Sequence, residues 1–230
     1  MSIEVVHECM SNGSSFDFAS KTKCFQAIEG LHNKLIPFCT PFFLAQDECH
    51  QLGNNKVTAS IILLTDGFCS ICNSEDDLYV YTLFPPSVVG LIDGYSTFNE
   101  IPTRPRHYIH AESDCYGYEI PLDTFVQKCD DLNLWRDICN ILAQRMLVMS
   151  SRERELIGVD TYSKVRSILI ELWLYPDHIR NQIRMTPFVQ RRTGSSRSQI
   201  MYIISALRKG NYLEIEKGKL VMLNKLPMAF

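Results

Sequence analysis

The sequence predicts an α+β protein made of a leading helix, a run of short strands, a long helix, and a C-terminal part of helices and a strand hairpin. Apolar residues recur at helical spacing over residues 17–34 and again after Leu122, which indicates helices. Between these segments, short apolar runs alternate with turn residues, which indicates strands. The C-terminal third also differs from the rest in charge, and this difference indicates a separate module.

The composition is that of a globular chain. Of its 230 residues, 46% are hydrophobic and 21% are charged, which suffices for a core and excludes a mostly disordered protein. The longest unbroken aliphatic run covers residues 61–64, far fewer than the ~20 apolar residues of a membrane helix. The first thirty residues lack a basic start followed by an apolar block, so we expect no secretory signal and a cytoplasmic protein.

Four parts follow one another in this prediction. Residues 1–16 form a flexible N-terminus, and residues 17–130 hold the leading helix and a β-sandwich or roll. Residues 131–158 form the long helix, and residues 159–230 form a C-terminal domain. The expected strands of the second part are the apolar runs at residues 41–45, 57–64, 68–71, 78–83, 88–92, 108–111 and 116–120.

The long helix is predicted to be capped by Asn133 and carries two apolar stripes. One stripe, here called the seam, recurs at spacings of four and three: Trp135, Cys139, Leu142, Met146 and Met149. The second stripe lies beside it: Leu134, Ile138, Ile141 and Val148. A surface helix of a monomer needs only one apolar stripe, so we expect this helix to pack on its own roll and on a second copy of the chain. A single wide core face is the alternative.

The net charge of −3 is the sum of an acidic N-terminal part and a basic C-terminal part. Residues 161–230 hold 12 Lys+Arg against 4 Asp+Glu, whereas residues 1–160 hold 11 against 22. A basic C-terminal part with a net charge of +8 indicates a polyanionic partner for that part. Chance clustering of the charges is the alternative.

The segment from residue 185 to 223 has the pattern of a winged helix-turn-helix. Thr186-Pro187 is predicted to start a short helix that ends at Thr193, Gly194-Ser195 forms a turn, and Ser196 caps a second helix over residues 197–209. Strands at residues 212–216 and 220–223 follow, joined by Lys217-Gly218-Lys219. An oligomerisation module with the same secondary structure is the alternative.

This layout predicts binding to double-stranded DNA. The first turns of the second helix of such a motif enter the major groove, where Arg bonds guanine and Gln bonds adenine. The cations of the hairpin suit contacts with phosphate. The candidate DNA-binding residues are Thr186, Arg191, Arg192, Ser196, Arg197, Ser198, Gln199, Tyr202, Lys217 and Lys219.

With this order of elements, residues 25–225 resemble the Crp/Fnr family of transcription regulators, in which a cyclic-nucleotide-binding-like β-roll, a dimerisation helix and a winged helix-turn-helix follow one another. Two stretches carry the resemblance: Thr161-Tyr162-Ser163-Lys164-Val165-Arg166-Ser167-Ile168-Leu169 and Gly194-Ser195-Ser196-Arg197-Ser198-Gln199-Ile200. Arg197 matches the family's base-reading arginine. Ser198 and Tyr202 fall where the family commonly has glutamate and arginine, so the family's target sequence is not carried over. The resemblance implies a homodimer, double-stranded DNA and RNA polymerase as partners, and no enzyme activity.

Other stretches are similar to a branch of the family that controls oxidative-stress genes, here the genes of hydrogen peroxide resistance. They are residues 89–94, 111–118, 134–136 and 206–212. A thiol-redox-gated or ligand-gated regulator of a different set of genes is the alternative. A metal-dependent β-barrel enzyme built on His107, His110 and Glu112 is a remote alternative, because the two histidines fall on opposite faces of a strand.

The effector pocket of the family is altered in this sequence. Cyclic-nucleotide binders have a glycine–glutamate pair for the ribose and an arginine–serine pair for the phosphate. Here the first pair reads Gly90-Leu91, and the second falls at Arg104 and Arg106 without the serine in register. We therefore expect weak or no binding of cyclic nucleotides, although the two arginines remain candidates for another anion.

The nine cysteines all precede residue 140, and their odd number and scattered spacing predict no disulfide framework in a reducing compartment. Cys69 and Cys72 are separated by two residues and should face opposite sides of a strand, which disfavours chelation by this pair. We expect no cofactor, no metal site and no catalytic residue. Candidates for redox sensing are Cys69, Cys72, Cys115 and Cys139.

Overall fold

A computed structural model describes residues 14–53, 58–101 and 106–229. By its internal contacts the chain divides into two compact units. The roll unit comprises Cys24–Ala143. The C-terminal unit comprises Gln144–Phe230 together with the N-terminal residues up to Lys23. Within the described ranges, none of the helices has the length and apolar character needed to cross a bilayer. Most of the predicted flexible N-terminus, as well as Arg104 and Cys9, lies outside the described residues.

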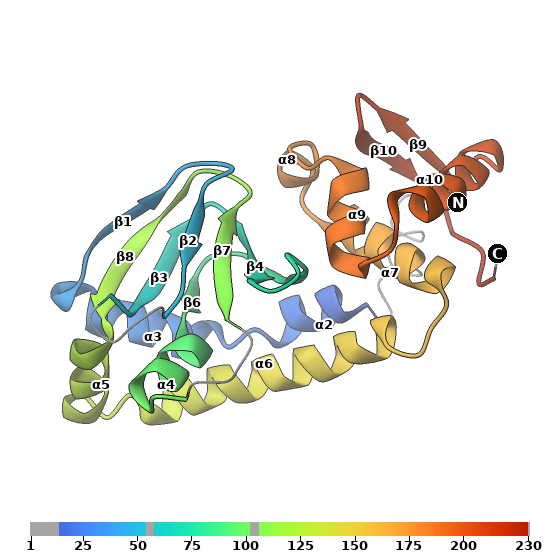
Figure 1. Cartoon of the computed structure of the whole chain (residues 1–230). Coiled ribbons are helices and arrows are strands. Elements are labelled where there is room, and N and C mark those ends of the chain that lie inside the picture. The colour runs from blue at the N-terminus through green and yellow to red at the C-terminus, as the bar shows by residue number, and fades with distance from the viewer. Residues whose placement is uncertain (1–13, 54–57, 102–105, 230) are drawn as a thin grey trace. The chain divides into compact units, whose positions relative to one another are not determined.

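The roll unit contains two antiparallel four-stranded sheets, ordered β1-β8-β3-β6 and β2-β7-β4-β5 (Figure 1). The strands are β1 Thr40–Leu44, β2 Cys49–Gln51, β3 Ser60–Asp66, β4 Cys69–Asn73, β5 Tyr79–Leu83, β6 Ser87–Val89, β7 His107–Ala111 and β8 Cys115–Pro121. One apolar core holds Ile62 and Leu64 of β3 with Ile71 and Ile109 of the other sheet. The alternate residues Ile61 and Leu63 belong to a second core, so β3 is buried on both faces and reads as an unbroken apolar run.

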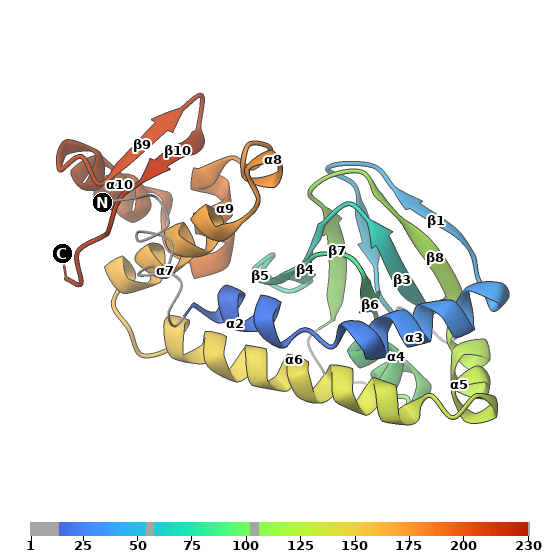
Figure 2. The same cartoon turned by 180° about the vertical axis from the view of Figure 1, so that it is seen from behind.

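Helices supply the other side of that second core. They are α3 Phe25–Leu35, the 3-10 turn η1 Ile36–Phe38, α4 Leu91–Phe98, α5 Leu122–Asp131 and the first turns of α6 Trp135–Leu156. Both views show α3, α4, α5 and the start of α6 gathered along the same end of the roll (Figures 1 and 2). The second apolar stripe predicted for the long helix points into this core, because Leu134, Ile138 and Ile141 are at most 3% exposed.

Several local predictions for this part are wrong, each for a structural reason. The leading helix is two helices, α2 Ser15–Thr22 and α3, because Lys23 leaves the helical region. The predicted strand at residues 88–92 ends at Val89, since Gly90 adopts φ +95° and starts α4. Strand β2, short and polar, carries no apolar signal that would have revealed it. Asn133 has φ +52° and does not cap α6, whose first hydrogen bonds are accepted by the carbonyl of Leu134.

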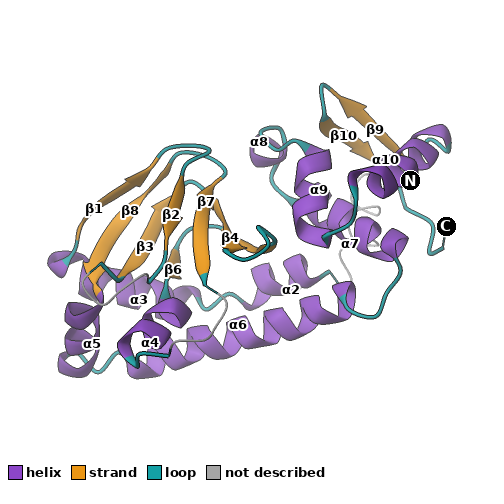
Figure 3. Cartoon of the chain, in the orientation of Figure 1, coloured by secondary structure: helices purple, strands orange, loops and turns teal. Residues whose placement is uncertain are grey.

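The C-terminal unit is mainly helical and ends in a hairpin (Figure 3). Its later elements are α7 Thr161–Leu174, α8 Asp177–Arg180, α9 Met185–Thr193, α10 Arg197–Lys209, β9 Leu213–Glu216 and β10 Lys219–Leu223. The predicted cap of α7 is confirmed: Asp160 accepts hydrogen bonds from the backbone N–H and the hydroxyl of Ser163 at 2.9 and 2.8 Å. The bounds predicted for α10 are also confirmed. The predicted cap of α9 is wrong, because Arg184 occupies the N-cap position and Thr186 lies in the first turn.

Gly90 gives a test of how the roll is packed. A Cβ at this position would lie 2.9 Å from the carbonyl oxygen of Ser60, and the φ of +95° is strained for any other residue. We expect Gly90→Ala to lower the free energy of unfolding by the left-handed cost of ~1–2 kcal/mol plus an overpacking cost of ~1–3 kcal/mol. Urea unfolding measures this. In the control Gly218→Ala, φ is +81° with open space around the new Cβ, so only the first cost should appear. Equal losses in the two variants would contradict the close packing at Gly90.

Candidate nucleic-acid interface

The turn between α9 and α10 is built by local capping. Gly194 ends α9 in the left-handed conformation, and its N–H bonds the carbonyl of Gln190 at 3.0 Å. Ser196 then caps α10: its hydroxyl accepts from the backbone N–H of Gln199. Because both caps are made by neighbouring residues of the chain, the first turn of α10 is fixed without contacts to its exposed face.

Helix α10 has one buried and one exposed face. Ile200, Ile203, Ile204 and Leu207 are at most 5% exposed and pack inward. The opposite face presents the candidate residues Ser196, Arg197, Ser198, Gln199 and Tyr202, all exposed, with Tyr202 at 70%. Thr186 of α9 lies beside this helix, its hydroxyl 3.9 Å from the sulfur of Met201. The structure therefore brings these six candidate residues together at the positive end of a helix dipole.

Gln199 also caps the helix, a role that its sequence position did not reveal. Its side-chain oxygen accepts from the backbone N–H of Ser196 at 3.3 Å, which completes a capping box. A two-point contact with adenine needs both the oxygen and the nitrogen of the amide, so such a contact would open the box. Arg197 is exposed and takes no part in the capping box, whereas the hydroxyl of Ser198 lies 3.1 Å from that of Ser196.

The hairpin is attached to the start of α9. Lys217 and Gly218 both have positive φ, which is typical of a two-residue turn between twisted strands. The carbonyl of Gly218 accepts from the N–H of Met185 at 2.9 Å, so the turn is held against the helix pair. Lys217 is exposed and Lys219 is half-buried, so both cations lie at the tip of this hairpin.

Arg192 does not join this surface, and the prediction that it contributes to DNA binding is wrong for this structure. It is 3% exposed and lies 2.8 Å from the carboxylate of Glu171 on α7. It also donates to the hydroxyl of Tyr175 at 3.0 Å, and that hydroxyl donates to Glu171 at 2.8 Å. Its neighbour Arg191 is exposed. A charged Glu171 within an apolar helical run, and Arg192 four residues after Phe188, are the signals that could have revealed this buried pair.

Of the altered effector residues, Leu91 belongs to the roll core and Gly90 is buried beside it. Leu91 is 8% exposed and packs in the second apolar core, and Gly90 precedes it at the start of α4. Asp93, 3% exposed, accepts from the backbone N–H of His107 at 3.2 Å and lies 3.1 Å from its ring nitrogen. Arg106 is exposed. Sequence reasoning missed the Asp93–His107 pair, which joins α4 to β7.

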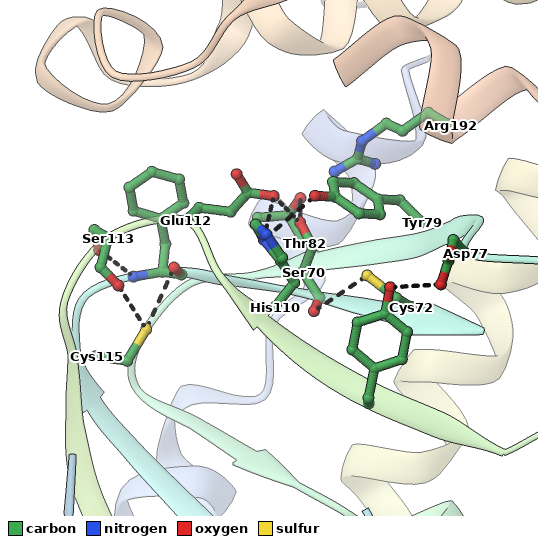
Figure 4. A network of polar contacts seen from close by, with 12 residues as sticks. Ser70, Cys72, Asp77, Tyr79, Thr82, His110, Glu112, Ser113, Cys115 and Arg192 are labelled. Atoms are coloured by element: carbon green, nitrogen blue, oxygen red, sulfur yellow. Dashed lines mark hydrogen bonds and ion pairs between the residues drawn. The ribbon is translucent and has the colours of Figure 1, made fainter. Parts of the chain in front are cut away.

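Polar side chains also form a network on the β2-β7-β4-β5 sheet (Figure 4). The hydroxyl of Ser70 donates to Glu112 at 2.7 Å, and His110 lies 3.3 Å from the hydroxyl of Tyr79. His110 is 3.7 Å from the Glu112 carboxylate, which suits an ion pair when the ring is protonated. Across the part of the chain that the structure covers, no three His, Cys, Asp or Glu side chains are grouped so that they could hold a metal ion.

The redox candidates differ in access. Cys69, Cys72 and Cys115 are buried in the roll, whereas Cys139 on α6 is exposed. The seam of α6 is largely uncovered, since Trp135 is 41%, Met146 71% and Met149 44% exposed, while Leu142 is half-buried. Leu147 and Ile157, which the seam did not include, are 60% and 67% exposed.

Comparison with known proteins identifies relatives that share this sequence and fold. Residues 161–228 match a family model described as winged helix-turn-helix DNA binding. The Escherichia coli K12 protein named inhibitor of hydrogen peroxide resistance is 32% identical over 177 residues, which cover 77% of this chain and 81% of that protein. The chain belongs to the family of the inhibitor of hydrogen peroxide resistance, and its fold is that of the Crp/Fnr transcription regulators. Two solved structures show the same fold. One is the c-di-GMP responsive global regulator CLP of Xanthomonas campestris, with a TM-score of 0.65, 16% identity, and coverage of 86% of this chain and 100% of that one. The other, a Crp/Fnr regulator of Eubacterium rectale, has a TM-score of 0.64 and 15% identity, and covers 86% and 90%.

The buried pair under the interface gives a stability test. Arg192→Ala leaves the Glu171 carboxylate buried without this partner, and we expect it to lower the free energy of unfolding by ~3–5 kcal/mol. The fluorescence of Trp173 on α7, recorded in a Trp135→Phe background, follows urea unfolding of this unit. Arg191→Ala, at the exposed neighbouring position, should change stability by less than ~0.5 kcal/mol. Similar losses for the two variants would contradict the structural role assigned to Arg192.

Proposed function

We propose that this protein is a homodimeric DNA-binding transcription regulator that controls genes of hydrogen peroxide resistance and does not respond to cyclic AMP. The observation that carries the proposal is the capped start of α10, where Arg197, Ser198 and Tyr202 are exposed together above a buried apolar face. The peroxide assignment is supported by the 32% identical relative and its printed name.

The geometry suits docking into a duplex. A helix of 13 residues with a free N-terminal turn fits a major groove ~12 Å wide, and its dipole favours the approach of phosphates. Exposed Lys217 at the hairpin tip and exposed Arg191 on α9 extend the positive surface toward the backbone of the DNA. In this arrangement the arginine of α10 reads bases, while the hairpin lysines add affinity with little sequence information.

The seam of α6 supports dimerisation. Methionine and tryptophan side chains at helical spacing are uncovered on this helix, while its second apolar stripe is occupied by the roll core. A second copy that packs its own seam against this one would cover both sets of side chains. A dimer would then present two α10 helices to half-sites one helical turn apart, ~34 Å.

The pocket chemistry supports independence from cyclic AMP. The position after Gly90 carries a leucine whose side chain is packed in the core, and a leucine offers no acceptor for ribose hydroxyls. The polar group nearest along α4, Asp93, is engaged by His107. Gene control by this protein therefore responds to a signal other than cyclic AMP, or takes place without an effector.

Binding to DNA is tested by a salt titration and two substitutions. We expect the logarithm of the affinity for a selected duplex to fall linearly with the logarithm of salt concentration. Arg197→Ala should weaken binding to the preferred sequence by ~1–3 kcal/mol, about 5- to 150-fold. Lys217→Ala should weaken binding to all sequences alike and reduce the salt slope by about 1. Lys34→Ala, an exposed cation of the roll unit, is the control and should leave affinity unchanged. Absence of duplex binding at low salt by the wild type would overturn the proposal.

Dimerisation is tested separately by sedimentation. Met146→Glu places a charge in the centre of the seam, and we expect it to shift the protein from dimer to monomer because a buried unpaired charge is strongly unfavourable. Asn140→Glu adds the same charge at an exposed polar position of α6 and should remain dimeric. A wild-type protein that stays monomeric at micromolar concentration would contradict the role of the seam.

A further inference from the structure

Two buried cysteines of the roll are neighbours although their strands belong to different sheets. Cys69 begins β4, in the β2-β7-β4-β5 sheet, and Cys115 begins β8, in the β1-β8-β3-β6 sheet. Each is 1% exposed, and both lie in the same apolar core. Their chain segments are in close contact, because a Cβ on Gly67, two residues before Cys69, would lie only 2.9 Å from the Cα of Cys115. The pair therefore spans the space between the two sheets.

The backbone on either side holds the pair in place. The sulfur of Cys115 lies 3.4 Å from the carbonyl oxygen of Phe68, the residue before Cys69. The N–H of Phe68 donates to the hydroxyl of Ser113 at 3.0 Å, and the contacts of Cys115 and Ser113 are visible in Figure 4. Gly67 permits this approach, because a Cβ there would lie only 2.1 Å from the carbonyl oxygen of Asp114. Residues 67–69 and 113–115 are thus packed and hydrogen-bonded against each other.

The two thiols are chemically unequal. The neighbouring Cys69 thiol lowers the pKa of the Cys115 thiol, whereas the neighbouring Cys115 thiol, together with burial, raises the pKa of Cys69. Of the two, Cys115 is therefore the more readily deprotonated thiol. It also follows the exposed residue Asp114 directly, so it lies next to the surface of the roll.

We propose that Cys69 and Cys115 are a peroxide-oxidised thiol pair that closes a disulfide between the two sheets of the roll. The Cys115 sulfur attacks one oxygen of hydrogen peroxide, the O–O bond breaks, and a sulfenic acid and one water are formed. The Cys69 sulfur then attacks the sulfur of Cys115, the S–O bond breaks, and a second water leaves with the proton of Cys69. Two thiols lose two electrons in total, and one peroxide is reduced to two waters. Only the choice of peroxide as oxidant rests on the proposed function.

Other cysteines of the roll provide the comparison. Cys72 is on the same strand and fully buried, but it lies outside the core that holds the pair, with its sulfur 3.9 Å from the carbonyl oxygen of Ser70. Cys49 and Cys139 are exposed and are the side chains that an unselective oxidant reaches first. Selective oxidation of a buried pair over these exposed thiols is the signature of the proposed site.

The test is peptide mapping of the full-length protein after treatment with a small excess of hydrogen peroxide. Free thiols are alkylated under denaturing conditions, and the protein is digested without reductant. We expect a linked peptide that contains Cys69 and Cys115 and that dithiothreitol separates. Cys72→Ser should retain the link. Cys69→Ser should leave a sulfenic acid at Cys115 that dimedone traps.

Two results would overturn the inference. One is alkylation of both Cys69 and Cys115 in the oxidised wild type while Cys49 or Cys139 carries the oxidation. The other is a linked peptide that joins different cysteines. The mapping of the wild type decides between these outcomes even where a serine variant fails to fold. Because the readout is a covalent link, it is independent of DNA binding: loss of duplex binding by every variant would count against the proposed function and leave this inference standing.

Discussion

The buried ion pair between Arg192 and Glu171 is the contact on which the geometry of the DNA-binding module depends. It joins α9 to α7, and Tyr175 completes a closed set of hydrogen bonds around it. Arg152 of α6 is half-buried close by, and desolvation, with the charge of Arg192 as a second cause, lowers its pKa. Because both charges are buried, moving either Arg192 or Glu171 would leave the other charge without its partner, so the pair holds the two helices in one position. Since α9 runs directly into Gly194 and α10, the pair sets where the exposed start of α10 lies.

The sequence predicted the C-terminal unit better than the roll, and the reason is the range of the signals. Capping residues such as Asp160 and Ser196 act over three or four positions, so the bounds of α7 and α10 follow from local chemistry. Strand β2 and helix α4 are fixed by partners far along the chain, and no short pattern marks them. Arg192 shows the limit within the site: among consecutive polar residues, only packing against α7 decides which cation turns inward.

The roll has the fold of the Crp/Fnr regulators, but its effector region carries other residues than those expected of cyclic-nucleotide binders. Where cyclic-nucleotide binders are expected to offer a carboxylate, this chain packs Leu91 into the core, and the nearby Asp93 is engaged by His107. The two sheets instead enclose a thiol pair, Cys69 and Cys115, held by the turn at residues 112–114. If this pair is the oxidant-sensitive part of the molecule, the same fold that responds to a nucleotide elsewhere responds here to the formation of one covalent bond.

The central claim is that α10 meets the bases of duplex DNA, and photo-cross-linking tests it most directly. Tyr202 of α10 and Tyr95 of α4 are 70% and 65% exposed, so a benzoylphenylalanine at either position is similarly accessible. With a duplex selected for binding, we expect cross-links to bases of the major groove from position 202 and none from position 95. Cross-links from position 95 alone, or from neither position when the duplex is bound, would contradict it.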